Sequence, residues 1–508
     1  MNSGNRNRSI LRLLPLLLLA VLCSCNVPDP VPTATMTPDW TATPVPPTAT
    51  PIPTNTPTAT PVPAWLDVAP EDLADTQITI RYSLDGKVRD TLEELIGRFN
   101  EENQQGITLH AERAYSMDEL SKLTSADSSE KTDLVIAPSA YLRSRNADAK
   151  VLRELSDFLN YDDLALSGDG ITPIMPVMLE TENQNGNYYA LPLWTEPAFL
   201  FYNKTWAIEL GYPDSPVNLA EFAEQACAAG KASYAEKDEK KHGTGGWIVS
   251  SDPEDVMSWM LVFAKGEETP GDLLRSDSGE VFTDMASWLR NLLDNGCAWN
   301  SRVKEPYDYF ANRYALFYSG TYSDAERQFN AFEQSENNAF DNWDLVVYPA
   351  RTTDPGQNPR IYADGTSIAI IKDDDAKRAN AAWHFIRWLY QDTHAAELAV
   401  SAAGWPVQDS DSVTRLYRLS GEDKLYQTLS YRQYQVSSDA DENRITDLLI
   451  LSDGFAYVFN PSAKPENIPE IWGQIGSAIA EVNDVNQLSE TSASESSNQT
   501  GVNDETQP

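Results

Sequence analysis

The hydrophobic positions of residues 77–102 change from a period of two to the period of a helix. Gln77–Tyr82 alternates polar and apolar residues, which predicts a half-buried strand. Asp90–Glu102 carries its leucines, with Ile96 and Phe99, on one face, which predicts an amphipathic helix. The chain therefore begins its folded part, near Thr76, with a βα unit.

Polar residues follow the predicted strands. Ser83 and Asp85 lie in the glycine-containing turn after the first strand, and Ser139 follows a strand at Asp133–Pro138. Ligands of open α/β sheets bind at the carboxyl ends of strands, so these residues are candidate ligand contacts. Capping of the following helix is the alternative role for Asp85.

The stretch Tyr189–Lys204 combines a buried strand with proline on both sides of a polar centre. Pro192 and Pro197 flank Trp194 and Glu196, and proline removes a backbone donor, which argues against an ordinary central strand. We interpret this stretch as a hinge that lines a ligand cleft. The continuous apolar run that follows predicts a strand covered on both faces.

This stretch resembles the hinge segment of the bacterial extracellular solute-binding proteins, family 1, the sugar-binding components of ABC importers. Ala315–Tyr322 resembles another family segment, in which Tyr322 takes the position of a ligand-stacking tryptophan. Ala363–Ile371 and Ala402–Val407 resemble the second and third crossings between lobes, and they contribute Asp364 and Trp405.

The resemblance covers residues 76–485 and implies an α/β fold of the two-lobed periplasmic-binding-protein type (type II) with three hinge crossings. The expected regions are a signal peptide at 1–24, a lipidated cysteine and linker at 25–75, a first lobe at 76–193 and 366–404, a second lobe at 194–365 and 405–485, and a polar, disordered tail at 486–508.

The N-terminal residues have the pattern of an exported lipoprotein. A basic segment precedes an apolar run too short to span a bilayer comfortably, and the run ends in Leu22-Cys-Ser-Cys25. Cys25 is the expected lipidated residue, with cleavage before Cys23 as the alternative. Residues 26–63 are rich in proline and threonine, which predicts an extended spacer between the membrane and the folded part.

Net charge and cysteine content restrict the partners and the compartment. The formal charge of −38 disfavours nucleic acid and anionic membrane surfaces as partners. Cys227 and Cys297 are the only cysteines of the expected folded region, and an exported chain meets an oxidising environment, so we predict that they form a disulfide.

No catalytic motif stands out. The four histidines are scattered without metal-site spacing, and neither a nucleophile elbow nor a phosphate loop occurs. We therefore expect a binding protein, without cofactor or metal, and not an enzyme. A secreted carbohydrate-active enzyme with two carboxylates is the less favoured alternative, because motifs alone do not exclude it.

Aromatic rings near glycine or proline are the candidate ligand surfaces, because sugar C–H faces lie on such rings while carboxylates and hydroxyls bind sugar hydroxyls. We expect a neutral mono- or oligosaccharide, with a cationic polyamine as the alternative. The predicted site is Ser83, Asp85, Ser139, Trp194, Glu196, Trp247, Tyr322, Asp364 and Trp405.

The resemblance also implies partners and location. We expect a monomer, held by its lipid anchor at the outer face of the cell membrane, that closes around its solute and delivers it to the permease subunits of an ABC importer.

Overall fold

The computed structural model describes residues 66, 68–125, 128–161, 164–168, 170–303, 305–352, 358–436 and 444–482. The predicted signal peptide, Cys25, most of the linker and the tail from residue 486 lie outside the described residues.

The first lobe is built on β1 (Gln77–Tyr82), β2 (Thr108–Arg113), β3 (Leu134–Pro138) and part of β11 (Ile361–Ile370). The strand order is β2-β1-β3-β11, in which the first three strands are parallel and β11 is antiparallel to β3. Parallel pairing places the carboxyl ends of β1, β2 and β3 at one edge of the sheet.

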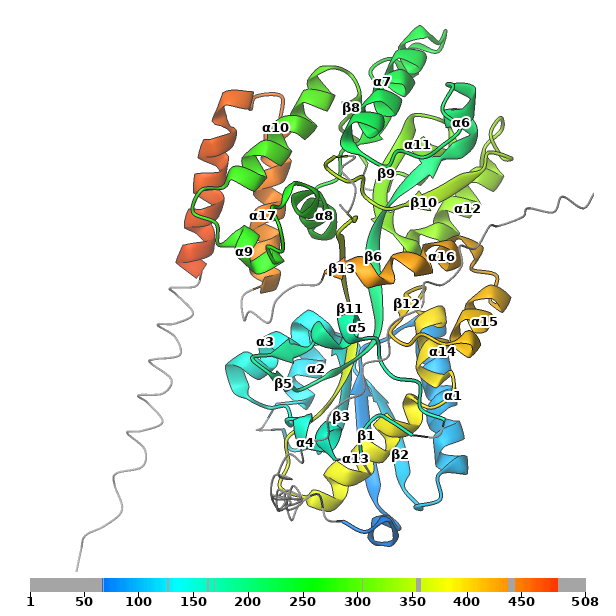
Figure 1. Ribbon diagram of the computed structural model, residues 1–508, viewed down its shortest axis with the longest axis vertical. Helices are drawn as coiled ribbons and strands as arrows, with labels where there is room; N and C mark the ends of the chain where they lie inside the picture. The colour runs from blue at the N-terminus through cyan, green and yellow to red at the C-terminus, as the bar shows by residue number, and fades with distance from the viewer. Residues whose placement is uncertain are drawn as a thin grey trace, which may run out of the picture. The chain divides into compact units, whose positions relative to one another are not determined.

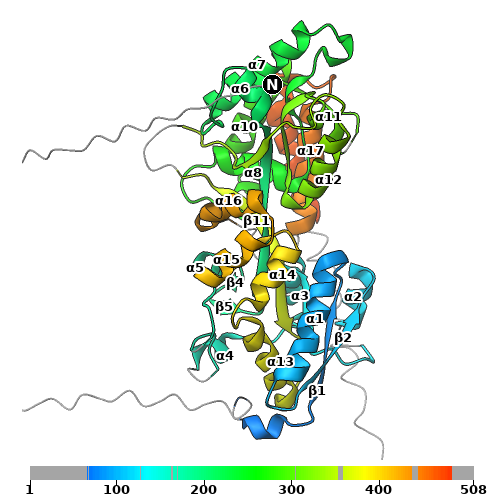
Figure 2. The same cartoon turned by 90° about the vertical axis from the view of Figure 1, so that its right-hand side faces the viewer.

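Helices cover both faces of this sheet, as the alternating side chains of β3 require. Leu134 and Ile136 pack into the cluster that contains α1 and α13, whereas Val135 and Ala137 pack into a smaller cluster with α2 and α3. Figure 2 shows α1 and α14 side by side over this lobe. The covering helices are α1 (Gly86–Glu102), α2 (Met117–Leu123), α3 (Ser139–Ala149), α13 (Ala376–Leu389) and α14 (His394–Ser401).

The second lobe has its own mixed sheet. It comprises β6 (Leu191–Asn203), β7 (Gly245–Ile248), β8 (Ala298–Trp299), β9 (Ala315–Thr321) and β10 (Trp343–Val346). The order is β10-β6-β9-β7-β8, with β9, β7 and β8 parallel. The helices around it are α6 (Lys204–Glu209), α7 (Leu219–Ala235), α8 (Pro253–Phe263), α10 (Glu280–Asp294), α11 (Tyr307–Ala311), α12 (Ala325–Gln334), α17 (Arg444–Val458) and a helix at 468–482.

Strands β6 and β11 run through both lobes (Figure 1). The first half of β6 pairs with β11, and its second half pairs with β9 and β10. The tryptophan-containing centre is thus part of one unbroken strand despite its two prolines. Close strand approach is possible because residue 365 is glycine: a Cβ there would lie 2.0 Å from the carbonyl oxygen of Trp194.

The side chains of β6 alternate between two hydrophobic clusters. Phe199 and Phe201 pack into the cluster that continues into the first lobe. Ala198, Leu200 and Tyr202 pack on the opposite face, among α7, α8, α10 and α17. One strand therefore belongs to the cores of both lobes.

A third segment joins the crossing at β12 (Trp405–Pro406), which pairs with β6 at Thr195 and Trp194. After β12 the chain forms α15 (Asp411–Leu419) and α16 (Asp423–Thr428), and α16 contacts β10. Strand β13 (Gln435–Val436) then pairs with β11 before the chain enters α17.

Two details concern the predicted boundaries and the cysteines. Residues before 76, assigned to the linker, include Leu66 and Leu73, which are buried in the first-lobe cluster. That part of the linker prediction is wrong, because these leucines pack in the hydrophobic core.

Cys227 and Cys297 form a disulfide, which confirms the predicted pairing. It joins α7 to the start of β8. Within the described part of the chain, no helix combines the length and apolarity needed to cross a bilayer.

Candidate functional site

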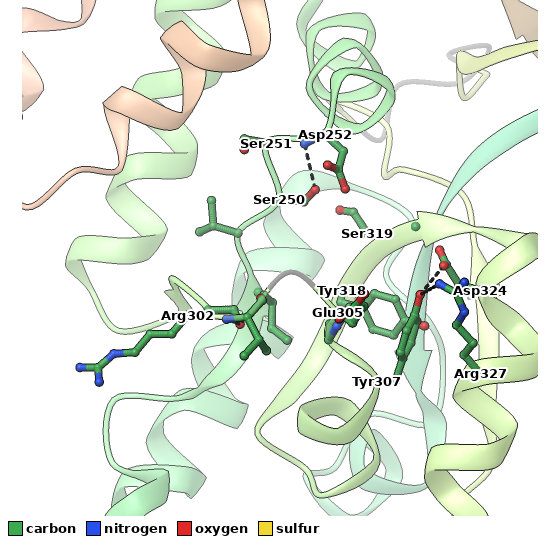
Figure 3. A pocket seen from close by; sticks show the side chains of 16 residues that line it. Ser250, Ser251, Asp252, Arg302, Glu305, Tyr307, Tyr318, Ser319, Asp324 and Arg327 are labelled. Carbon is green, nitrogen blue, oxygen red and sulfur yellow. Dashed lines mark hydrogen bonds between the residues drawn. The ribbon is translucent and has the colours of Figure 1, made fainter. Parts of the chain in front are cut away.

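A cavity of about 500 Å³ opens in the second lobe, at the carboxyl ends of β7, β8 and β9 (Figure 3). Because these strands are parallel, the segments that follow them meet at one edge of the sheet. The lining residues are Ile248, Val249, Ser250, Ser251, Asp252, Ser301, Arg302, Val303, Glu305, Pro306, Tyr307, Tyr318, Ser319, Gly320, Asp324 and Arg327.

The cavity lies at the edge of the second lobe that is nearest the crossing strands. Gly320 and Thr321, at the end of β9, pair with Phe199 and Ala198 of β6, only a few residues from the crossing residue Glu196. This is the position at which open α/β sheets bind ligands.

Tyr307 presents the half-buried ring of the cavity. Its hydroxyl donates to Asp324 Oδ1 at 2.6 Å, and Arg327 Nη1 donates to that hydroxyl at 3.3 Å (Figure 3). Asp324 Oδ2 in turn accepts the backbone N–H of Thr321 at 3.0 Å, which fixes the carboxylate at the start of the following helix. Burial, together with the bond to Asp324, raises the pKa of Tyr307, so its hydroxyl stays protonated and oriented.

Ser250 and Asp252 line the opposite part of the cavity. The hydroxyl of Ser250 accepts the backbone N–H of Asp252 at 3.2 Å and donates to the buried carboxyl of Asp255. Tyr348 also donates to Asp255, at 2.9 Å. Burial raises the pKa of Asp255 to about 8. A buried carboxyl group therefore orients a hydroxyl that faces the cavity.

Tyr318 lies at the base of the cavity, with its ring stacked on Phe201 at 4.4 Å between centroids. Its hydroxyl is buried and has no hydrogen-bond partner among the described residues. Burial raises the pKa of Tyr318 well above its usual value, with contributions from Asp324 and Tyr307, which both line the cavity. Because this oxygen is buried, it is not open to the cavity in this structure.

Glu196 and Asp364 lie opposite each other where β6 and β11 pair. Glu196 is exposed, and its Oε1 accepts the indole N–H of Trp194 at 2.9 Å. Desolvation by surrounding protein raises the pKa of Glu196, and the negative charges of Asp364 and Glu254 add to this effect. Its carboxylate is thus exposed at the crossing, with one hydrogen bond from the protein.

Asp364 is held by a buried polar network. Arg143 Nη2 donates to both carboxylate oxygens of Asp364, at 3.1 and 3.0 Å, and Arg143 Nη1 lies 3.4 Å from Glu182. Ser367 donates to Glu182 at 2.7 Å and bonds Ser139 at 2.6 Å. The network thus connects two predicted site residues, Ser139 and Asp364, but Ser139 itself is buried beneath the surface.

The other polar candidates lie apart from the cavity. Ser83 and Asp85 are at the carboxyl end of β1, in the first lobe. Asp85 occupies the N-cap position of α1 without a side-chain cap bond, and its carboxylate pairs with Arg113. Neither residue lines the cavity described above.

The four predicted stacking rings are buried, although glycine or proline neighbours each of them. Trp194 is 2% exposed, Trp247 0%, Tyr322 5% and Trp405 0%. Their polar atoms are bound within the protein: Trp247 donates to Ser319 at 3.3 Å, Trp405 to Thr428 at 2.9 Å and Tyr322 to Glu422. In this structure, none of these rings offers a face to a ligand.

The sequence analysis did not predict the main residues of the cavity. Ser250, Tyr307 and Asp324 lie in segments that follow second-lobe strands or begin second-lobe helices. The strand-end rule that selected Ser83 and Ser139 in the first lobe would have selected Ser250 after β7 as well. Tyr307 carries no such signal, because only the folded sheet brings it to that edge.

Two lobes joined by shared crossing strands, with a polar cavity at the strand ends, define a two-lobed periplasmic-type binding protein. The chain belongs to the bacterial extracellular solute-binding proteins, whose family model matches residues 94–411. Proteins of this family bind solutes and are not enzymes. A comparison with curated proteins gives no match.

Solved structures share the fold at low sequence identity. The cyclic alpha-maltosyl-1,6-maltose binding protein from Arthrobacter globiformis aligns with a TM-score of 0.63 and 16% identity, over 80% of this chain and 98% of its own. The sugar-binding protein MalE from Xanthomonas citri gives 0.63 and 16%, over 80% and 99%. An ABC substrate-binding protein from Listeria monocytogenes in complex with cycloalternan gives 0.59 and 17%, over 80% and 99%.

Proposed function

We propose that this protein is the substrate-binding lipoprotein of an ABC importer and captures a mono- or oligosaccharide between its lobes. The cavity at the carboxyl ends of β7, β8 and β9, next to the crossing strands, is the observation that carries the proposal. It offers one half-buried ring, Tyr307, beside hydroxyl and carboxylate groups, the combination that sugar rings require.

The similar structures support carbohydrate as the ligand class, because they include a cyclic alpha-maltosyl-1,6-maltose binding protein, a sugar-binding protein and a substrate-binding protein in complex with cycloalternan. In the proposal, Cys25 carries the lipid, residues 26–63 act as spacer, and the permease subunits receive the solute. The protein acts as a monomer at the outer face of the membrane.

A polyamine is the second candidate ligand. Glu196 is exposed at the crossing and Asp252 lines the cavity, and carboxylates of this kind also suit a cation. The two candidates differ in whether a sugar ring or an extended amine occupies the cavity.

A thermal-shift screen of the soluble chain from residue 64 against mono- and oligosaccharides and spermidine tests the proposal. A ligand at a hundred times its dissociation constant adds about 2.7 kcal/mol to the free energy of unfolding. We expect a saccharide to raise Tm and to be recovered unchanged. Hydrolysis of the bound saccharide, or stabilisation by spermidine with no saccharide effect, would contradict the proposal.

A further inference from the structure

A buried carboxyl group, Asp255, connects two hydroxyls of the cavity wall. It lies in the first turn of α8 and is 3% exposed. One of its oxygens contacts the hydroxyl of Ser250, and the other accepts the hydroxyl of Tyr348 at 2.9 Å. Tyr348 also forms a hydrogen bond with Ser319. Because Ser250 and Ser319 both line the cavity, Asp255 reaches the cavity wall by two hydrogen-bonded routes.

The elements packed against α8 bring no cation to Asp255 among the described residues. The buried titratable groups on these elements are Tyr202 of β6, Tyr362 of β11, Arg290 of α10 and Asp447 of α17. None of them bonds to Asp255, and the guanidinium of Arg290 is bound by Asp294 and by two backbone carbonyls. Another neighbour, α9 (Pro270–Leu274), carries only the exposed Asp272.

The surroundings of Asp255 favour its protonated form. Asp252 and Glu254, at the start of the same helix, are the charged groups with the largest effect on it, and both are negative. A carboxyl group buried among hydroxyls without a cation keeps its proton at neutral pH, because ionisation in such surroundings is costly. The pKa of about 8 agrees with this argument.

The proton on Asp255 decides the direction of its bond to Ser250. The oxygen of Ser250 already accepts the backbone N–H of Asp252 at 3.2 Å. When Asp255 is ionised, the hydroxyl of Ser250 donates to it, and only a lone pair is left for the cavity. When Asp255 donates its proton to Ser250, the serine oxygen has two donors, and its own hydrogen turns to the cavity.

The route through Tyr348 has the same outcome. The oxygen of Ser319 accepts the indole N–H of Trp247 at 3.3 Å. When Asp255 donates its proton to Tyr348, the hydroxyl of Tyr348 turns to Ser319, and the hydrogen of Ser319 is released to the cavity. One proton on Asp255 therefore appears at the cavity wall as one hydroxyl donor, through either serine.

A donor at this end of the cavity complements an acceptor beside it. Asp252 lines the cavity next to Ser250 and has no side-chain cap bond (Figure 3). A ligand hydroxyl that gives its single hydrogen to Asp252 needs a donor for its own oxygen. Ser250 or Ser319 supplies that donor only while Asp255 is protonated.

We propose that Asp255 is a positioning residue of the solute site, which in its protonated form turns a serine hydroxyl of the cavity wall toward the solute and in its ionised form withdraws it. Affinity for a saccharide therefore falls as Asp255 ionises. This inference rests on the proposed function and adds a regulation of the same cavity.

The pH dependence of saccharide binding tests the inference. Glucose, maltotriose and cycloalternan are the probes, and calorimetric titration of the full-length protein at pH 6 and pH 9 gives their affinities. A probe that binds should lose about five- to tenfold in affinity at pH 9, because only about a tenth of the molecules then keep the proton on a group with a pKa of about 8.

Asp255→Asn separates positioning from packing. The amide keeps the shape of the carboxyl group and always carries donor hydrogens, so this variant should bind the probe with similar affinity at both pH values. Asp277→Asn, an exposed change before α10, is the matched control and should show the wild-type loss. A purely structural role for Asp255 would instead weaken binding by the same factor at both pH values.

A titration without ligand tests the hydrogen-bonded routes themselves. NMR of isotope-labelled aspartate side chains follows the carboxyl of Asp255, which is identified by its absence from Asp255→Asn. Ser250→Ala and Tyr348→Phe each remove a donor to the ionised carboxylate, so each should raise the pKa of Asp255.

The outcomes separate the two proposals. Saccharide binding that does not change with pH, a pH dependence that Asp255→Asn retains, or an Asp255 carboxyl that is already ionised at pH 6 would overturn this inference and leave the proposed function in place. An Asp255 titration that neither Ser250→Ala nor Tyr348→Phe changes would do the same. The absence of binding by every probe would overturn both.

Discussion

Tyr307 is the ring that the cavity exposes, whereas Trp405 is enclosed in the core. Tyr307→Ala should weaken saccharide binding by more than about 1 kcal/mol with little loss of stability, as expected for a central aromatic contact. Tyr307→Phe, which keeps the ring and loses the bond to Asp324, should retain most of the affinity. Trp405→Ala should instead lower the free energy of unfolding by about 3–5 kcal/mol, because it empties a packed site. Calorimetric titration and urea unfolding of the three variants distinguish these effects, and equal affinities for wild type and Tyr307→Ala would remove Tyr307 from the site.

Asp255 should make stability depend on pH. Its pKa is about 8 in the folded protein, raised from an ordinary value of 3.8 mainly by burial. Between these values the folded state holds a proton that the unfolded state has lost, so the free energy of unfolding falls as pH rises, by up to about 1.4 kcal/mol per pH unit.

Asp255→Asn removes this titration, so its stability should vary less than that of wild type between pH 5 and pH 8. Urea unfolding at several pH values measures both slopes. Parallel slopes for the two proteins would show that Asp255 is ionised in the folded state.

Single residues also show where sequence reasoning fails. Proline and glycine beside Trp194, Trp247, Tyr322 and Trp405 indicated exposed turns, but β6 is paired on both edges, and its neighbours cover Trp194. Local pattern cannot reveal such coverage, because β11 and β12 come from residues far along the chain.

At the scale of elements, the sequence predicted much of the fold. The alternation of Gln77–Tyr82 predicted β1 with its observed bounds, because one face of that strand is consistently apolar. The helix predicted at Asp90–Glu102 begins earlier, at Gly86, because the polar first turn has no periodic apolar signal. The cavity was less predictable, since three separate strand ends form it.

The disulfide between α7 and the start of β8 should stabilise the second lobe. It closes a loop with a sequence separation of 70 residues, and a crosslink of this kind contributes about 2–4 kcal/mol. The double variant Cys227→Ala/Cys297→Ala should therefore unfold at lower urea concentration than wild type. An unchanged midpoint, or two titratable thiols in the denatured, unreduced wild type, would contradict the assignment.

At the scale of the whole folded part, the shared crossing strands allow the lobes to close on a ligand. Hinge closure is the common behaviour of such binding proteins. We expect a saturating saccharide to reduce the radius of gyration of the chain from residue 64 in small-angle scattering. Superimposable curves with and without ligand, at a concentration that calorimetry shows to be saturating, would argue against closure.

Strand β6 contributes alternate side chains to the hydrophobic clusters on its two faces. If one lobe lost its packing, the strand would expose apolar surface that belongs to the other, so partial unfolding carries an added free-energy cost. The two lobes should consequently melt as one cooperative unit, with calorimetric and van't Hoff enthalpies that agree. Two resolved heat-absorption peaks would instead mean that the lobes hold their structure independently. Cooperativity of this kind would let a ligand bound at the second-lobe cavity protect the first lobe from proteolysis as well.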